Sequence, residues 1–251
     1  MRRLSDEFIE YPLPLFCIPY AGGNASVYKD WAPAAPEGVE VCPVELPGRG
    51  RLFKQPFADS LEALAGTIRE GITPHTARPY AIFGHSMGAL LAYEVTAQLR
   101  SAGHSEPSAL FLSGRCPPFG GRTGTSVSRL PDPQFLEHLR KLAGTPQEIL
   151  ASEELMQIFL PVLRSDFSLC EEYEPQEAQI FTMPVTVMSG DEDAETSERE
   201  MQRWRFVTTG AFNFRRYPGD HFFMKNPLVM RDVYGDLEKL FLKADVGPRH
   251  G

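Results

Sequence analysis

The feature that most constrains the fold is a serine enclosed by two glycines between a predicted strand and a predicted helix. The motif Gly84-His85-Ser86-Met87-Gly88 has the form G-x-S-x-G. The apolar run 80–83 precedes it and the helical pattern 89–92 follows it. In a nucleophile elbow this order puts the serine on a sharp turn, where the glycines leave room for the backbone and the helix N-terminus faces a developing oxyanion. The pattern predicts an exposed, polarised hydroxyl at Ser86; the alternative is a serine that only caps a helix.

A serine hydroxyl is a weak nucleophile, so a histidine must take its proton during attack and return it to the leaving group. His221 is the candidate, because the segment 218–223 forms a turn between the last predicted strand and the last predicted helix. His85, beside the serine, is expected to point to the opposite side of the turn and to be a packed, hydrogen-bonded neighbour. The remaining histidines lie outside such a context, at positions 75, 104, 138 and 250.

A third, acidic member is expected at the end of the preceding strand. The predicted strand 184–189 runs directly into an acidic loop that contains Asp191 and Asp193. We favour Asp193, because the turn at Gly190 needs a few residues before a side chain can reach back toward His221, and Asp191 stays the alternative. The chain order serine, aspartate, histidine is that of α/β-hydrolases and differs from the chymotrypsin and subtilisin orders.

An acyl-transfer site also needs two backbone amides that stabilise an oxyanion. One is expected from Met87, directly after the serine. The other is expected from the loop after the first predicted strand, where the segment 19–23 reads Pro-Tyr-Ala-Gly-Gly. Ala21 or Tyr20 is the candidate donor, although a glycine-rich turn often has no role beyond the turn itself.

Short apolar runs alternate with amphipathic stretches along the chain, which is typical of an α/β protein. Helical patterns occupy 60–71, 89–102 and 227–243. This alternation predicts a single domain over residues 1–251 with the α/β-hydrolase fold, a mostly parallel, doubly wound sheet. The predicted strands are 13–19, 39–46, 80–84, 109–113, 184–189 and 212–217.

The alternation stops between Ser113 and Pro184, where no convincing strand occurs. We interpret residues 116–183 as a helical insertion, with helical patterns at 133–142, 146–151 and 153–173. Its start is rich in Gly, Pro, Ser and Thr, which favours a mobile lid over a cap that merely covers a sheet edge.

Composition narrows the possible partners and location. The net charge of -8 opposes binding to nucleic acid. No apolar run reaches the roughly 18 residues of a membrane-spanning helix, and acidic residues interrupt the N-terminus where a signal peptide would be apolar. The 4 cysteines are scattered without CxxC spacing, so neither a metal site nor a disulfide framework is expected. We expect a cytoplasmic monomer that uses no cofactor or metal.

Five segments together resemble type II thioesterases, which serve polyketide synthases and nonribosomal peptide synthetases. The resemblance runs from Leu13 to about Leu240. The proline-glycine-arginine turn and the segment LPVLRSDF make it far more specific than the elbow, which many hydrolases share. The segments are FCIPYAGG at 16–23, ELPGRG at 45–50, GHSMGA at 84–89, LPVLRSDF at 160–167 and YPGDHFF at 217–223.

The resemblance implies an editing enzyme that acts in trans. It would hydrolyse stalled or wrongly primed acyl groups from the phosphopantetheine arm of acyl or peptidyl carrier proteins. Carried over by motif, Ser86 is the nucleophile, His221 the base and Asp193 the orienting acid, and family members carry a helical lid between the sixth and seventh strands. A thioester suits such a site because its thiolate leaves readily, so a serine triad needs no metal.

The chain departs from the family pattern at three positions. Tyr20 stands where the family usually has histidine, and Asp220 where it has glycine. A carboxylate at 220 would favour the charged form of His221 if it faced the ring. Ala194 follows Asp193 where the family has proline, which keeps the choice of triad acid open.

Other functions stay possible on sequence alone. A carboxylesterase or lipase would use the same residues on oxygen esters, and a non-catalytic hydrolase-fold protein would only bind a carrier, although it need not retain all three triad residues. A small basic cluster, Arg49, Arg51 and Lys54, could meet an acidic carrier or its phosphodiester. A structural role is the commoner one for each of these side chains.

Overall fold

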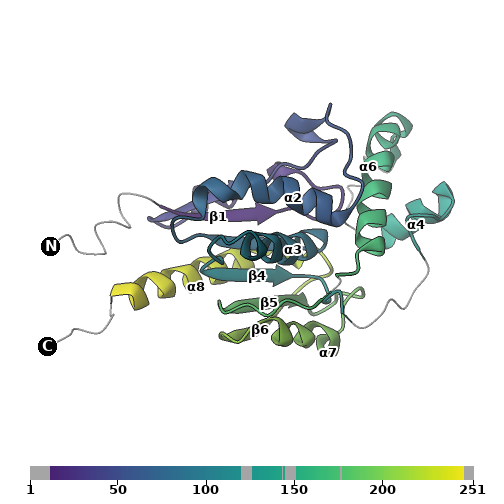
Figure 1. Ribbon diagram of the computed structural model, residues 1–251. Coiled ribbons are helices and arrows are strands. Elements are labelled where there is room, and N and C mark those ends of the chain that lie inside the picture. The colour runs from purple at the N-terminus through teal and green to yellow at the C-terminus, as the bar shows by residue number, and fades with distance from the viewer. Residues whose placement is uncertain (1–11, 120–125, 143, 145–150, 176, 246–251) are drawn as a thin grey trace, which may run out of the picture.

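A single parallel sheet forms the centre of the molecule (Figure 1). The computed structural model describes residues 12–119, 126–142, 144, 151–175 and 177–245. The sheet has 6 strands in the order β2-β1-β3-β4-β5-β6, and all neighbouring pairs are parallel, which confirms the predicted fold class. The strands are β1 (Leu13–Ile18), β2 (Val39–Pro43), β3 (Ala81–His85), β4 (Ala109–Ser113), β5 (Val185–Gly190) and β6 (Phe212–Tyr217).

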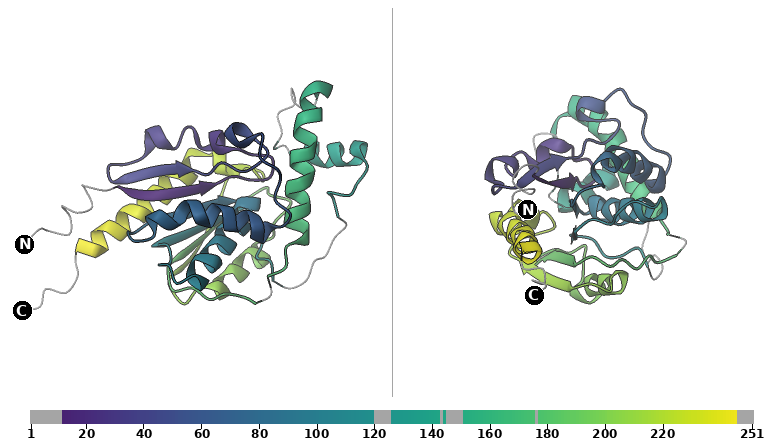
Figure 2. Two further views of the ribbon diagram at one scale, coloured as in Figure 1. Left: turned by 45° about the horizontal axis from the view of Figure 1, so that its top comes forward. Right: turned by 60° about the vertical axis from the view of Figure 1, so that its left-hand side comes forward.

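Helices cover both faces of this sheet (Figures 1 and 2). Strand β1 shows how the sequence supplies two cores: Phe16 and Ile18 pack with helices α2 (Leu61–Ile72) and α3 (Met87–Ser101), whereas Leu15 and Cys17 pack with helix α8 (Pro227–Asp245). Successive side chains of a strand point to opposite faces, so a strand that is apolar at every position is buried on both sides. The continuous apolar runs in the sequence have this cause.

The carboxyl ends of the strands gather the segments that the sequence singled out. The loop 19–23 follows β1, Ser86 follows β3, the acidic loop follows β5, and the turn that holds His221 follows β6. Because all strands run in the same direction, these ends lie along one edge of the sheet, where open α/β sheets bind their ligands.

Among the residues that the structure describes between β4 and β5, two long helices stand where the sequence predicted an insertion. They are α4 (Asp132–Leu142) and α6 (Glu153–Glu172), and α6 crosses the carboxyl edge of the sheet (Figure 1). A small apolar cluster of Phe135, Leu139 and Leu163 joins them. Most of the helix expected at 146–151 lies outside the described residues.

Shorter helices complete the fold. They are η1 (Ala25–Tyr28), η2 (Ala32–Ala34), η3 (Gly50–Leu52), η4 (Thr73–His75), α7 (Glu198–Met201), η5 (Gln202–Val207) and η6 (Phe223–Lys225).

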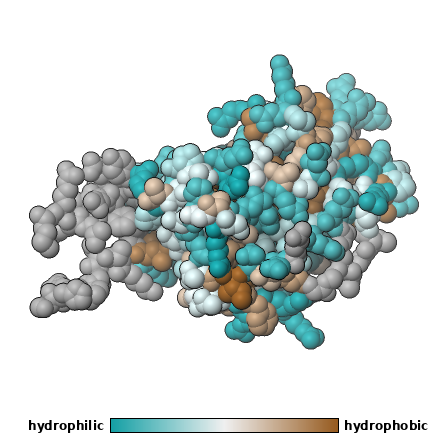
Figure 3. Space-filling model, in the orientation of Figure 1, coloured by the Kyte–Doolittle hydropathy of each residue, from teal (hydrophilic) through white to brown (hydrophobic). Residues whose placement is uncertain are grey.

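In the part of the chain that the structure describes, no helix has the length and apolar character to span a membrane. The face shown in Figure 3 is mostly hydrophilic, with hydrophobic residues in small scattered groups.

Candidate active site

The turn at Ser86 is the most strained backbone of the described chain. Ser86 has φ 55°, and among the described residues it alone has a positive φ without being glycine. Its amide donates to the carbonyl oxygen of Ser113 at 2.8 Å, which holds the turn against β4. A Cβ atom on Gly84 would lie 1.9 Å from the carbonyl oxygen of Gly88, and one on Gly88 would lie 2.2 Å from that of Ile18. Both glycines are therefore required sterically, and strain of this kind concentrates at functional sites.

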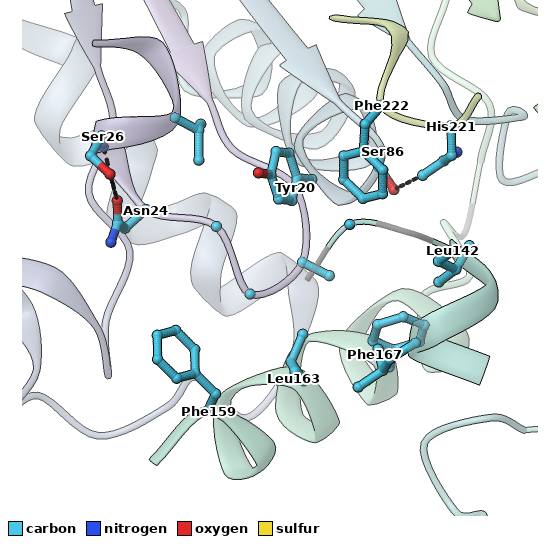
Figure 4. A pocket seen from close by; sticks show the side chains of 16 residues that line it. Tyr20, Asn24, Ser26, Ser86, Leu142, Phe159, Leu163, Phe167, His221 and Phe222 are labelled. Atoms are coloured by element: carbon cyan, nitrogen blue, oxygen red, sulfur yellow. Dashed lines mark hydrogen bonds between the residues drawn. The ribbon is translucent and has the colours of Figure 1, made fainter. Parts of the chain in front are cut away.

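Three predicted side chains meet beside this turn. The Nε2 atom of His221 lies 3.0 Å from the hydroxyl oxygen of Ser86 (Figure 4). The Nδ1 atom of the same ring lies 3.1 and 3.0 Å from the two carboxylate oxygens of Asp193. The side chains come from the ends of β3, β6 and β5, so a continuous hydrogen-bond chain links segments distant in sequence.

The environment of Asp193 keeps its carboxylate charged. Burial alone raises the pKa of this carboxyl, but the hydrogen bond and charge of His221, together with the amide of Glu195 at 2.9 Å and the hydroxyl of Thr196 at 3.0 Å, lower it below its ordinary value. An ionised carboxylate only accepts hydrogen bonds, so it selects the tautomer of His221 that carries a proton on Nδ1 and leaves Nε2 free to accept from Ser86.

The two other acidic residues considered from the sequence lie elsewhere. The carboxylate of Asp191 pairs with Arg216 at 2.9 Å and is about half exposed, away from the histidine ring. The carboxylate of Asp220 accepts the amide of Phe222 at 2.7 Å, so it fixes the turn. The structure thus brings Asp193, and neither of these two, to His221.

His85 is a second histidine at the site. It is completely buried, and its Nδ1 atom lies 2.9 Å from the hydroxyl of Ser113, as expected for a packed, hydrogen-bonded neighbour. Its ring centre is 5.3 Å from that of His221, so it lies against the site, contrary to the expected position across the turn. Burial, and next the nearby His221, hold the pKa of His85 well below its ordinary value, so this ring is neutral.

A cavity of about 280 Å³ opens at Ser86 and His221. Figure 4 shows Phe159, Leu163 and Phe167 of α6 on one side, facing the loop that contains Tyr20. Apolar walls with a few convergent polar groups are typical of a small-molecule pocket. Further lining comes from Val27, Leu139, Leu142 and Phe222.

The glycine-rich loop forms part of the same cavity wall. The amide of Gly22 donates to the carboxylate of Asp166 at 2.7 Å, and that of Gly23 donates to the carbonyl oxygen of Tyr20 at 2.8 Å. With these two engaged, the amides of Tyr20 and Ala21 stay the candidate donors in the loop. Both residues line the cavity.

Sequence reasoning did not find the partner of Arg49. The side chain is buried and pairs with the fully buried Asp166 of α6, which agrees with the structural role that the sequence favoured and leaves Arg49 unable to dock a carrier. Arg51, by contrast, is exposed. A usable signal was present: the segments ELPGRG and LPVLRSDF each contain one acidic and one basic residue, so both segments hold possible members of an ion pair.

The described residues contain no group of three or more His, Cys, Asp or Glu arranged to hold a metal ion. The site instead combines a serine on a strand-to-helix turn with a histidine and a buried aspartate at the carboxyl edge of a parallel sheet. These features define the class, a serine hydrolase with the α/β-hydrolase fold.

The chain belongs to the thioesterase family, whose thioesterase domain matches residues 13–237. This confirms the resemblance that the sequence motifs carried. It is 39% identical over 213 residues to linear gramicidin dehydrogenase LgrE of Brevibacillus parabrevis, covering 84% of this chain and 81% of that one. It is 39% identical over 212 residues to gramicidin S biosynthesis protein GrsT of Aneurinibacillus migulanus, covering 84% and 83%.

A solved structure agrees with the assignment to the thioesterase family. The crystal structure of ClbQ from the colibactin NRPS/PKS pathway superposes with a TM-score of 0.87 at 33% identity, covering 92% of this chain and 99% of that one.

Proposed function

We propose that this protein releases stalled or wrongly primed acyl groups from the phosphopantetheine arm of acyl or peptidyl carrier proteins in polyketide or nonribosomal peptide biosynthesis. The observation that carries the proposal is the hydrogen-bond chain from Ser86 through His221 to Asp193, which opens into an apolar cavity. GrsT is named for gramicidin S biosynthesis and ClbQ for the colibactin NRPS/PKS pathway, and these two relatives supply the biosynthetic context.

In the first half-reaction the hydroxyl oxygen of Ser86 attacks the thioester carbonyl carbon while Nε2 of His221 takes the hydroxyl proton. Asp193 stabilises the imidazolium that forms. The carbonyl oxygen becomes an oxyanion that accepts hydrogen bonds from the amides of Met87 and Ala21. The intermediate then collapses: the carbon–sulfur bond breaks, and the pantetheine sulfur leaves as a thiol with the proton held by His221.

In the second half-reaction water attacks the acyl ester on Ser86. His221 takes a proton from this water, the same amides receive the oxyanion, and the proton returns to the serine oxygen as the carbon–oxygen bond breaks. The products are a free carboxylic acid and the regenerated enzyme. The carrier keeps its phosphopantetheine thiol and can be loaded again.

The cavity favours an uncharged, mainly apolar acyl chain. Burying a charged or unpaired polar group among Phe159, Leu163 and Phe167 would cost free energy, because these three side chains offer it no hydrogen bond. Aliphatic and aromatic acyl groups lose no hydrogen bonds there. The pocket therefore suits the acyl groups of early polyketide intermediates better than charged aminoacyl groups.

The helices between β4 and β5 act as a lid over this cavity in our proposal, within one domain that spans residues 1–251. The first half of α6 exposes Leu155 and Ile158, whereas the second half is tied to the body by Asp166 and, just after the helix, by the bond of Tyr173 to Glu94 at 2.6 Å. Pro161 separates the halves and cannot donate a helical hydrogen bond. Opening is thus expected to involve the first half of α6.

The name of LgrE gives a dehydrogenase activity for that protein. Such a reaction would not use the hydrogen-bond chain of Ser86, His221 and Asp193. Hydride transfer is the chemistry of nicotinamide or flavin cofactors and does not use a serine nucleophile. For this chain we propose hydrolysis without cofactor or metal, by a monomer that meets its carrier in the cytoplasm.

The decisive experiment compares acyl release from acyl-phosphopantetheine carrier proteins with release from matching oxygen esters, for the wild type and for Ser86→Ala. The proposal predicts serine-dependent release with a strong preference for carrier thioesters. A preference for free oxygen esters would indicate a general esterase. Wild-type turnover by a folded Ser86→Ala variant would refute the mechanism.

A further inference from the structure

A buried ion pair joins three segments beside the cavity. The guanidinium of Arg49 donates to both carboxylate oxygens of Asp166 on α6, with its Nη2 atom 2.7 Å from Oδ1. The Nε atom of Arg49 also donates to the carbonyl oxygen of Pro47 at 3.2 Å, and its Nη1 atom to that of Gly23 at 3.4 Å. The pair is almost completely removed from solvent. A bidentate pair of this kind is directional and holds its partners in one geometry.

The same carboxylate controls the glycine-rich loop. Oδ2 of Asp166 accepts the amide of Gly22 at 2.7 Å, and Gly22 adopts a left-handed conformation with φ 76°. The contact is tight, since a Cβ atom on Gly22 would lie 2.5 Å from the Cδ2 atom of Leu163 on α6. The loop therefore rests directly on the helix through one charged acceptor and one apolar side chain.

We infer that Asp166, held by Arg49, is a positioning residue for the oxyanion hole. This inference rests on the proposed function, in which the amide of Ala21 is an oxyanion donor. The hydrogen bond to Asp166 fixes the peptide plane between Ala21 and Gly22, and this plane shares the Cα atom of Ala21 with the preceding amide and so restrains the direction of that amide. A donor oriented in advance stabilises an oxyanion without reorganisation during the reaction.

Arg49 also neutralises the charge of Asp166. A lone carboxylate beside the loop would repel the negative charge that develops on the substrate oxygen. The guanidinium neutralises that carboxylate while leaving one of its oxygens able to accept from Gly22. Asp166 can thus orient the loop without opposing the oxyanion.

The test compares two double variants, Arg49→Met/Asp166→Asn and Arg49→Met/Asp166→Leu. Both remove the two charges, and a neutral replacement of a buried ion pair is commonly tolerated. Asparagine keeps an oxygen that can accept from Gly22, whereas leucine, of similar size, does not. We expect kcat on a p-nitrophenyl acyl ester to be about 10- to 100-fold lower in the leucine variant than in the asparagine variant, with similar KM.

Affinity for a trifluoromethyl ketone separates positioning from general damage. This inhibitor forms an oxyanion on Ser86, so its affinity should fall in parallel with kcat, while affinity for the free carboxylic acid product stays equal in the two variants. Equal kcat in two folded variants would overturn the inference. An equal loss of inhibitor and product affinity would also overturn it, because it would indicate a collapsed pocket.

A measurement on the wild type covers the case in which the leucine variant does not fold. The amide of Gly22, followed by NMR hydrogen exchange, should be as protected as core strand amides both without ligand and in the ketone adduct. Rapid exchange without ligand, or protection that arises only in the adduct, would overturn the inference. These measurements use small esters and ketones, so a failure on carrier thioesters would reject the carrier as substrate but not the serine mechanism, which is the part of the proposed function on which this inference depends.

Discussion

At the scale of single residues, the site depends on groups that differ little in sequence and greatly in surroundings. Asp191 and Asp193 lie two positions apart in one acidic loop. The first shares a surface ion pair with Arg216, while the second is enclosed and hydrogen-bonded to His221. Their expected contributions to catalysis differ accordingly.

The substitution Asp193→Asn should lower kcat by about four orders of magnitude, because an amide favours the wrong tautomer of His221. Asp191→Asn is the matched control and should keep wild-type kcat. Stopped-flow or discontinuous ester hydrolysis measures both. A large loss in the Asp191 variant with none in the Asp193 variant would reverse the assignment.

The neutral state of His85 makes folding stability depend on pH. Its pKa is lowered in the folded protein, first by burial, so the unfolded chain binds the proton more readily. The free energy of unfolding is therefore highest above the pKa of a histidine in the unfolded chain, about 6.5. It decreases as the pH falls below this value, by up to about 1.4 kcal/mol per pH unit.

Urea unfolding of the wild type and of His85→Gln at pH 7 and pH 5 measures this effect. Glutamine can still hydrogen-bond to Ser113 but does not titrate. The wild type should lose more stability than the variant between the two pH values. An equal loss in both proteins would show that another group controls this range.

At the scale of elements, helix α6 connects the catalytic edge of the sheet with the cavity. Its first half contributes Phe159 to the cavity wall, and its second half carries Asp166 and the bonds of Glu171 to Val127 at 2.6 Å and to Ser128 at 3.1 Å. Burial alone would raise the pKa of Glu171. The hydroxyls of Ser126 and Ser128, followed by the two amides, donate hydrogen bonds to its carboxylate and lower the pKa below its ordinary value. One helix thus has a weakly held and a firmly held half.

Hydrogen exchange should resolve the two halves of α6. Amides of 153–160 are expected to exchange faster than those of 163–172, because the first half has fewer buried contacts and local opening follows contact density. Mass spectrometry of peptides that divide at Pro161 makes the comparison. Uniform protection along the helix would argue against a lid that opens at this point.

Phe159 is expected to limit the acyl chain. Phe159→Ala removes an aromatic ring from the cavity wall and should shift kcat/KM toward longer chains by about 10-fold or more, since each pocket contact of this size discriminates by roughly 1–3 kcal/mol. Phe206→Ala is the control, because this phenylalanine is largely exposed. A series of acyl esters of increasing length measures the shift, and an unchanged length profile would contradict it.

At the scale of the whole molecule, the sheet divides two apolar cores that each contain one of the 2 tryptophans. Trp204 packs against Tyr93 of α3, and Trp31 packs on the opposite face against Tyr234 of α8. Both cores share the six strands, so unfolding one face removes the support of the other. A single cooperative unit is the expected result.

Single-tryptophan variants, Trp31→Phe and Trp204→Phe, allow each face to be followed by fluorescence during urea unfolding. In each variant the fluorescence transition should coincide with that of far-ultraviolet circular dichroism. Separate midpoints for the two probes within one variant would indicate that the faces unfold independently.

The sequence by itself determined the repeating and local features of this protein. Strand and helix periods, the glycine-enclosed Ser86 and the local context of each triad residue depend on residues near one another in the chain, and all six predicted strands occur in the sheet. The ends of strands and helices were predicted less accurately. The strand predicted over 39–46 ends at Pro43, and α3 begins at Met87, two residues before the predicted helix. Local turns set these ends more than periodicity does.

Only the tertiary structure decided which distant groups meet. Asp193 faces His221, His85 packs against that ring, and Arg49 pairs with Asp166 across 117 positions of sequence. Such contacts depend on strand order and on where each loop leaves the sheet edge, which no local pattern encodes. Burial then determines how strongly these charges act on their neighbours. A carboxylate enclosed with a partner orients the groups around it, whereas the same carboxylate in water is screened.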